Sequence, residues 1–565
     1  MDSYSVISES RKLLVDGILK NPLHTSLPSD IEDAAKSVEY TGSGMPSIPV
    51  NWRWTESISA LKGFQASMLN VLLKKKYGLE YQKVIINTDH AQLFIMSILL
   101  TIIDPLEGKL RFNDPGCTKF FPNGDKFQGM LGSPLTEAAT NIYKTKDERF
   151  YHIHGSMNAT PVEMALGIDP NDKVMDYTGA CAVYQAKIGQ LVATDLDSLM
   201  NDHYRQAGTI CYSIDEYKAT EQGQANAHVG LYEIHHLPIP KQAPGWWTSV
   251  DQYTSGKRPL FGLKVVDLTR VIASPTITRE LAELGASVMR ITSPNITDMT
   301  VLLCDLGWGK WNAHLDLTKS EDRARLRSLI EECDVVVDGY RPGIMEKWGF
   351  GKDDILGFFK EKERGIIYVH ENCYAWNGPW SHRSGWQQIS DACCGVSMEY
   401  GRAMGNDEPV TPPLPATDYC TGIIGAVGVL QALIQQSEKG GSYVVDIALN
   451  YYSQWLINKC STYPTNVWEA LWTNGGRPIF RHTDNMFITF PPILRTLMAQ
   501  QSPILNPEFF EIRDNKAIGV PVKTVKPILN FPDGIVKPGY NVGARGNGVD
   551  QPVWPHDLMQ EIVTL

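Results

Sequence analysis

Several features that would place a chain in a familiar class are missing from these 565 residues. The 10 cysteines include no CxxC pair and no cysteine–histidine array with zinc-ligand spacing, so neither a disulfide scaffold nor a zinc module is expected. The net charge is −11 and no dense block of lysine and arginine occurs, which argues against a nucleic-acid surface. We therefore expect reduced thiols, no bound metal and no nucleic-acid partner.

Long apolar runs are scarce as well. The most apolar stretch, residues 91–103, is short for a membrane span and is expected to form a buried helix. Residues 1–20 carry acidic side chains and lack the continuous apolar centre of a secretory signal. Together with the sparse cysteines, these absences predict a protein without membrane insertion, in the cytoplasm or another intracellular compartment.

The sequence pattern differs between the two halves of the chain. Before a proline-rich patch at residues 238–247 the pattern is mainly helical, and after it strand and helix signals alternate. We predict a linker at 241–258 and an α/β domain at 259–450. Residues 451–565 are predicted to form a helical segment and an extended C-terminal tail, because periodicity weakens there while glycine and proline become frequent.

The α/β prediction depends on short β-rich runs separated by helical segments. Ser274 and Pro275 look like an N-cap and first helical residue after the first run. The β-α-β order predicts a doubly wound parallel sheet. No GxGxxG follows the first strand and no Walker A loop occurs, which disfavours a dinucleotide oxidoreductase. The predicted strands are residues 263–268, 287–292, 334–338 and 365–370.

One carboxylate, Asp418, stands directly before a glycine-rich apolar segment that reads as a helix. Its Gly422, Gly425 and Gly428 recur every three residues, so another backbone can approach one face closely. Unpaired N–H groups and the helix dipole favour an ionised acid at such a position. An ionised, positioned carboxylate is a usable nucleophile. Local sequence leaves a plain N-cap aspartate as the alternative.

Six phrases of the second half, in order, resemble the family III CoA-transferases, the group that includes carnitine and formyl-CoA transferases. The resemblance implies a Rossmann-like, doubly wound α/β sheet with a smaller α+β domain and extended crossing segments. The six phrases are residues 260–275 (LFGLKVVDLTRVIASP), 281–291 (LAELGASVMRI), 314–318 (HLDLT), 334–343 (DVVVDGYRPG), 348–350 (WGF) and 413–422 (PLPATDYCTG).

The first half resembles the same family less completely. Residues 149–156 (RFYHIHGS) are similar to the strand that opens the family's smaller domain. The resemblance implies that residues 1–240 are a degenerate CoA-transferase-like region, in a tandem or rearranged chain, with a small-domain-like segment at about 140–235. His152 and His154 lie two apart in this strand, and because no third ligand is evident we expect no metal site there.

The resemblance also implies a mechanism. In the family, the acid at the position of Asp418 attacks an acyl-CoA thioester, and CoA passes through a mixed anhydride and an enzyme-bound thioester to an organic acid. Coenzyme A would thus be bound as substrate, an acyl-CoA and a small organic acid would be the partners, and a homodimer is allowed. For each basic residue the alternative is a surface charge. The implied CoA-binding residues are Val271, Ala273, Arg341, Lys347 and Arg383.

Two other functions stay open at this point. α-Methylacyl-CoA racemases share the fold but need a histidine where this chain has Trp386, which disfavours two-base proton transfer. A non-catalytic protein is the other alternative, since residues 310–312 (KWN) and Thr292 depart from the family pattern near the CoA phosphates.

Overall fold

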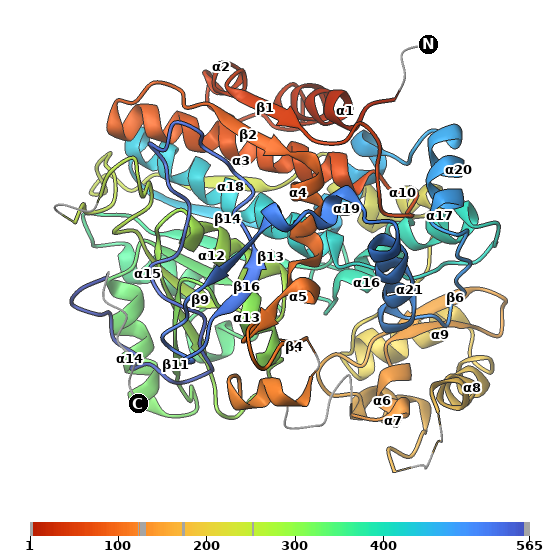
Figure 1. The fold of residues 1–565 in the computed structure, drawn as a ribbon. Helices are drawn as coiled ribbons and strands as arrows, with labels where there is room; N and C mark the ends of the chain where they lie inside the picture. The colour runs from red at the N-terminus through yellow and green to blue at the C-terminus, as the bar shows by residue number, and fades with distance from the viewer. Residues whose placement is uncertain are drawn as a thin grey trace.

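The computed structural model describes residues 4–558 apart from 113, 123, 125–131, 172, 173, 175 and 251–253. A seven-stranded sheet lies at its centre, in the order β11-β10-β9-β12-β13-β14-β8 (Figure 1). Neighbouring strands are parallel except β8, which pairs antiparallel with β14. The chain thus has the predicted α/β class. The strands are β8 (Glu233–Leu237), β9 (Lys264–Leu268), β10 (Ser287–Thr292), β11 (Lys310–His314), β12 (Val335–Asp338), β13 (Ile367–Asn372) and β14 (Ser442–Ala448).

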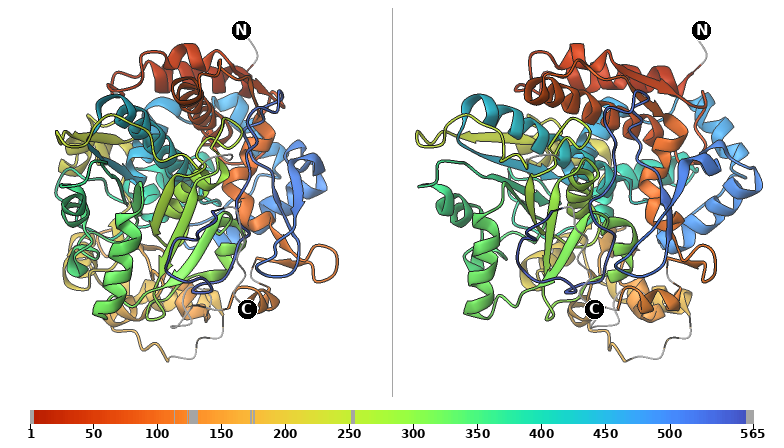
Figure 2. Two further views of the ribbon diagram at one scale, coloured as in Figure 1. Left: turned by 90° about the vertical axis from the view of Figure 1, so that its left-hand side faces the viewer. Right: turned by 60° about the vertical axis from the view of Figure 1, so that its left-hand side comes forward.

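Helices cover both faces of this sheet (Figure 2). Successive residues of β9 point to opposite faces, as the period of a strand requires. Val265 belongs to the same core as Ile277 of α12, whereas Val266 packs with Leu326 of α14 and Ile355 of α15. The helices involved are α12 (Ala273–Glu283) and α18 (Ala416–Lys439) on one side and α14 (Ser320–Glu331) and α15 (Lys352–Phe359) on the other.

Glycines let α18 lie unusually close to α12. A Cβ atom on Gly422 would stand 2.4 Å from Cβ of Thr276 and 3.0 Å from the backbone oxygen of Ala273. A Cβ on Gly425 would stand 2.6 Å from the side chain of Ile277. The close backbone approach predicted from the glycine spacing is therefore confirmed. It brings the N-terminal half of α18 against α12.

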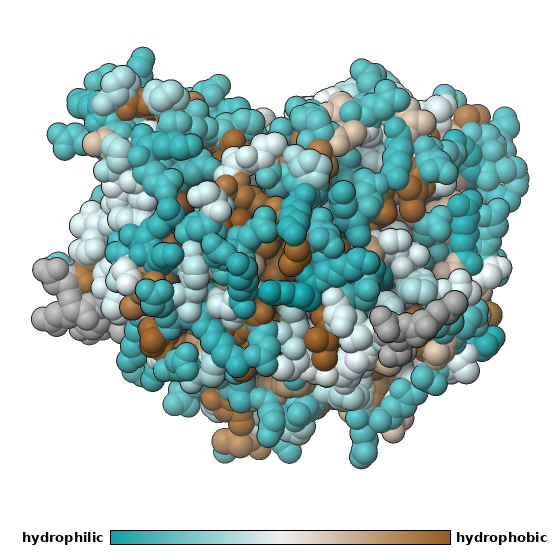
Figure 3. Space-filling view, turned by 90° about the horizontal axis from the view of Figure 1, so that it is seen from above, coloured by the Kyte–Doolittle hydropathy of each residue, from teal (hydrophilic) through white to brown (hydrophobic). Residues whose placement is uncertain are grey.

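α18 is also long and apolar enough, by length and composition, to cross a membrane, but 94% of its most apolar window is buried inside the protein. α3 (Trp54–Tyr77) packs along it, and residues 54–73 of α3 are themselves buried. The molecular face seen from above, over these N-terminal elements, is mainly hydrophilic with scattered apolar areas (Figure 3). α18 is a core helix of this fold.

Residues 132–212 contribute a smaller α+β unit, at the lower right of Figure 1. Its three strands form an antiparallel sheet in the order β5-β6-β7, and its helices pack on them around a separate apolar core. The elements are α6 (Pro134–Ala138), β5 (Asn141–Lys144), β6 (Phe150–Ile153), α7 (Thr160–Leu166), α8 (Tyr177–Ile188), α9 (Ala193–Ser198) and β7 (Gly208–Ile210).

The N- and C-terminal regions meet in a four-stranded sheet of order β15-β16-β3-β4. Residues 91–103 are mostly buried as predicted, but the single helix expected there is wrong, because a 3₁₀ segment at Leu93–Met96 interrupts it and β3 ends it. The two C-terminal strands were not predicted from the sequence. The elements are α4 (Thr88–Gln92), α5 (Ser97–Leu100), β3 (Ile102–Ile103), β4 (Leu110–Arg111), α21 (Met486–Ala499), β15 (Phe510–Arg513) and β16 (Val522–Val525).

Of the segment predicted as a linker the structure describes residues 241–250 and 254–258, while residues 251–253 lie outside the described residues, and part of the described segment packs against the rest of the protein. Trp247 is buried, and its indole N–H donates to the backbone oxygen of Phe261 at 3.0 Å. Leu14 and Leu497, from opposite ends of the chain, belong to the same core as Val265 of the central sheet. The division of the chain into domains stays a prediction.

Candidate functional site

Asp418 lies in the first turn of α18, where two cavities meet. The N-cap of the helix is Pro415, so the interpretation of Asp418 as a plain N-cap is wrong. The side chain is half-buried and borders one cavity of about 560 Å³ and another of about 480 Å³. Val271, Ile272 and Trp386 line both cavities as well. The two cavities therefore adjoin at Asp418 and these three residues.

The loop between β9 and α12 forms part of this junction. Val271 has φ +70°, a left-handed conformation that a β-branched residue rarely adopts. Backbone strain of this kind is retained mainly at functional sites. α12 begins at Ala273 with Ile272 as its N-cap, so the predicted cap at Ser274 is wrong and that serine lies inside the helix. Ala273, a predicted binding residue like Val271, lines the smaller cavity.

The smaller cavity, which we call the polar cavity, carries two arginines. Arg341, predicted from the sequence, donates from Nη1 to the backbone oxygen of Arg205 at 3.2 Å. Arg270, which the sequence reasoning missed, donates from Nη1 to the oxygen of Thr297 at 2.6 Å and lies 5.3 Å from the ring of Tyr340. A guanidinium has five N–H donors, so both retain donors for an anion.

The position of Arg270 offered a signal that could have found it. It follows the carboxyl end of β9, and ligands of open parallel sheets bind at that edge. Burial, helped by the neighbouring Arg270 and Arg205 charges, lowers the pKa of Arg341. Clustered cations of this kind gain most from an anionic ligand, because it relieves their mutual repulsion.

Two other predicted cations are not among the residues that line these cavities. Lys347 is exposed, and its Nζ lies 5.0 Å from the ring centre of Trp348. Arg383 pairs with Asp197 of α9 at 2.9 Å and lies 5.1 Å from the ring of Trp380. The Arg383 charge thus already has a partner in the smaller unit, while its neighbours Ser384 and Gly385 line the polar cavity.

Two neighbouring carboxyl groups, Glu371 and Asp391, act on Asp418 at the junction. Burial, then the charge of Glu371, then that of Asp391 raise the pKa of Asp418 well above its ordinary value. Burial also raises the pKa of Glu371 to about 7, although its carboxylate accepts a 2.6 Å hydrogen bond from Ser274 Oγ. We expected the helix N-terminus to keep Asp418 ionised, but burial and the neighbouring like charges have the larger effect on its pKa. Glu371, at the end of β13, was not predicted as a site residue.

Trp386 lies beside a pair of buried histidines, of which His154 also lines the larger cavity. Its ring stacks on His154 at 5.1 Å between centres, and its indole N–H donates to Ser156 Oγ at 3.1 Å. Burial lowers the pKa of His154 to about 3 and that of His152 to about 4, so both are neutral at physiological pH. Among the described residues no group of three histidine, cysteine, aspartate or glutamate side chains is placed to hold a metal ion.

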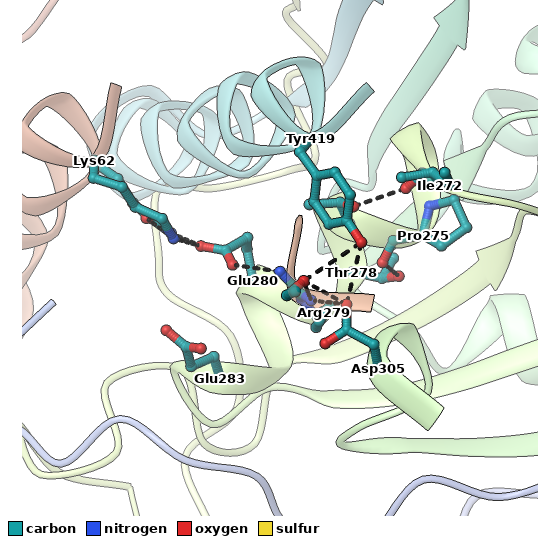
Figure 4. Close-up of polar contacts among 12 residues, drawn as sticks. Lys62, Ile272, Pro275, Thr278, Arg279, Glu280, Glu283, Asp305 and Tyr419 are labelled. Atoms are coloured by element: carbon teal, nitrogen blue, oxygen red, sulfur yellow. Dashed lines mark hydrogen bonds and ion pairs between the residues drawn. The ribbon is translucent and has the colours of Figure 1, made fainter. Parts of the chain in front are cut away.

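A buried charged network lies beneath the junction (Figure 4). Lys62 of α3 pairs with Glu280 of α12, and both side chains are fully buried. Next to this pair, Arg279 binds Asp305 at 2.7 Å, and the hydroxyl of Tyr419 donates to Asp305 at 3.2 Å. Because Tyr419 follows the candidate nucleophile directly, this network fixes the first turn of α18 against α12. Buried charges of this kind are costly unless all are paired.

Comparisons with known proteins show which proteins this chain is similar to. The family model described as CoA-transferase family III matches residues 260–476. Acetyl-coenzyme A transferase nodX of Hypoxylon pulicicidum is 51% identical over 565 residues, covering 99% of this chain and 95% of that protein. An acyl-CoA transferase of Gibberella moniliformis is 31% identical, and the match covers 75% of this chain and 74% of that protein. A solved CaiB/BaiF family protein from Brucella suis is 24% identical over 35% of this chain and 55% of its own, with a TM-score of 0.33.

Proposed function

This chain belongs to CoA-transferase family III, and we propose that it moves CoA from an acyl-CoA thioester to an organic acid with Asp418 as the nucleophile. The observation that carries the proposal is the position of Asp418 between a cavity with two arginines and a larger one. The arginine side suits the phosphates of CoA, which supports a thioester bound at the junction.

The proposed reaction has two symmetric halves. The Asp418 carboxylate attacks the thioester carbonyl, the C–S bond breaks, and a mixed anhydride and CoA thiolate result. The thiolate then attacks the aspartyl carbonyl, which releases the first acid and leaves CoA as an enzyme thioester. The incoming carboxylate attacks that thioester to give a second anhydride and the thiolate again. Attack of the thiolate on the acyl carbonyl yields the new acyl-CoA and restores Asp418.

The raised pKa of Asp418 bears on the first step. An acid with a raised pKa is a stronger nucleophile once ionised, but a smaller fraction of it is ionised at neutral pH. Glu371, which lines the polar cavity beside it, controls part of this balance through its charge. Val271 and Ala273 are proposed to hold the pantetheine side of CoA, and Arg270 and Arg341 its phosphates. Roles for Lys347 and Arg383 stay predictions.

An exchange assay tests the proposal. Because the 51% identical relative is named an acetyl-coenzyme A transferase, acetyl-CoA is the donor to test first, in a panel of acyl-CoAs and acids. Asp418→Asn should lower CoA exchange at least about 10³-fold, since the nucleophile is lost. Asp407→Asn, at an exposed aspartate, is the matched control and should exchange at the wild-type rate.

Mass spectrometry supplies the positive evidence. We expect a CoA thioester adduct on the peptide that contains Asp418, trapped from wild type but not from Asp418→Asn. Solvent deuterium entering the α-carbon of a branched acyl-CoA without exchange would replace the transferase with a racemase. Failure to bind CoA would leave the non-catalytic alternative.

We also infer finer features that accompany this function. The strand order supports a doubly wound, Rossmann-like layout, with the site at the carboxyl edge of the parallel strands. An intracellular location is inferred because acyl-CoA is an intracellular metabolite and the 10 cysteines are all free and buried. A homodimer stays a prediction, and sedimentation analysis would decide it.

A further inference from the structure

The larger cavity, which we call the apolar cavity, borders Asp418 and is lined mainly by apolar side chains. From its lining we infer that the acceptor is a bulky apolar monocarboxylic acid whose hydrocarbon part occupies this space. The inference rests on the CoA-transferase function proposed for the same site. At about 560 Å³ the cavity has room for about 19 water molecules of about 30 Å³ each, far more than an acetyl group needs.

Segments outside the matched family region build about half of the apolar wall. Ile98 and Leu99 come from α5 and Phe112 follows β4, near the N-terminus, while Phe490 and Leu494 come from α21, near the C-terminus. These elements are orange and blue in Figure 1. A wall of leucine, isoleucine and phenylalanine favours apolar ligand surface over water.

α21 gives an independent argument. Phe490, Ile493 and Leu497 belong to the main core, and Leu494 packs against that core. Phe490 and Leu494, one turn apart, also line the cavity. Leu494 is only partly covered by protein, and apolar side chains at such positions are normally covered. An apolar ligand would supply the missing cover.

The charges around the cavity disfavour a dicarboxylic acid. Among the described residues that line it, Arg111 is the one cation, and its side chain is exposed. Glu137 and Asp418 contribute carboxyl groups, and burial raises the pKa of Glu137. A second carboxylate on the substrate would therefore lose hydration and find no buried cation in return.

A series of acceptor acids tests the inference. With the best acyl-CoA donor, kcat/KM should rise about fourfold for each added methylene that enters the cavity, or more than about 100-fold from hexanoate to decanoate. Succinate and glutarate should be poorer than hexanoate. Formation of each new acyl-CoA is followed by chromatography and mass spectrometry.

Paired variants of α21 place the effect at the cavity. Leu494→Trp narrows it and should lower the decanoate-to-hexanoate ratio of kcat/KM at least about tenfold. Leu494→Ala widens it and should move the optimum to longer acids. Ile488→Trp, on the same helix but 37% exposed and outside the lining, should keep the wild-type ratio.

The outcomes separate the two proposals. Exchange that is equally fast for all chain lengths, fastest for a dicarboxylic acid, or insensitive to both Leu494 variants would overturn the apolar-acceptor inference and leave the transferase in place. Absence of exchange with every acid, together with no adduct on Asp418, would overturn the transferase and the inference with it.

Discussion

Replacing Asp391 by asparagine should change how the stability of the site depends on pH. Asp391 is 1% exposed, and its carboxylate accepts hydrogen bonds from Thr417 Oγ1 at 2.7 Å and Gln387 Nε2 at 2.6 Å. Burial nevertheless raises its pKa from 3.8 to about 7. The folded protein therefore binds this proton more tightly than the unfolded chain does. The associated stability is fully present below pH 4 and is lost as the pH rises through about 7.

The magnitude follows from the two pKa values. Between pH 5 and pH 8 the folded carboxyl loses its proton, while the unfolded one is ionised throughout, so wild type should lose about 2.5 kcal/mol from this group. Asp391→Asn cannot titrate and should not show this loss. Its free energy of opening, relative to wild type, should thus rise by about 2.5 kcal/mol from pH 5 to pH 8. Removal of the charge also lowers the pKa of Asp418, which acts in the same direction.

Native-state hydrogen exchange by mass spectrometry measures this locally. Amides of α16 (Gln387–Cys393) and α18 report the opening of this region without requiring one cooperative transition of a large protein. Exchange is followed at pH 5, 6, 7 and 8 after correction for intrinsic rates, with Asp407→Asn as the exposed control. If wild type and Asp391→Asn show parallel pH dependences, the buried, proton-binding role assigned to Asp391 is refuted.

Two further changes probe the junction. Gly422→Ala should destabilise the protein by about 1–2 kcal/mol, because crowding of the new Cβ against Thr276 exceeds the helix preference of alanine. The control is Gly357→Ala in α15, where a Cβ meets nothing within 4 Å, and this variant should be slightly stabilised. Thermal unfolding measures both. Glu371→Gln removes a charge that raises the pKa of Asp418, so the pH–rate profile of CoA exchange should move to lower pH; an unchanged profile would show that Glu371 does not act on the nucleophile.

The sequence was most informative where local rules and global packing agree. The strand at residues 287–292 was predicted with its observed bounds, since all six residues are buried and β-rich. The glycine spacing of α18 predicted a close neighbour because only a missing side chain permits it. The prediction of one helix for residues 91–103 was wrong, because apolar content predicts burial but does not determine the secondary structure. Tertiary packing divides the segment into short helices and a strand.

Electrostatic properties of the site were harder to read. The helix position of Asp418 predicts ionisation. Burial and the charges of Glu371 in β13 and Asp391 in α16 oppose it, and these depend on segments distant in the sequence. Likewise, Arg341 and Arg383 are both cations beside glycine-containing turns in sequence. Only the fold shows that Arg341 borders the polar cavity and that Arg383 is paired with Asp197 across the smaller unit. The sequence gives the charge of a residue, whereas the group that this charge pairs with depends on the fold.

The division of the site between matched and unmatched sequence has a mechanistic consequence. The matched region supplies Asp418, the β9–α12 loop and the arginines of the polar cavity, to which we assign the contacts with the CoA thioester. Part of the apolar wall comes from α5 and α21, outside the matched region, and another part comes from Val271, Ile272, Met299 and Leu302 inside it. Changes in α5 and α21 can therefore alter the acid that is accepted while the proposed nucleophile and CoA contacts stay as they are. We expect specificity in this protein to vary with α5 and α21, and reactivity with the central sheet.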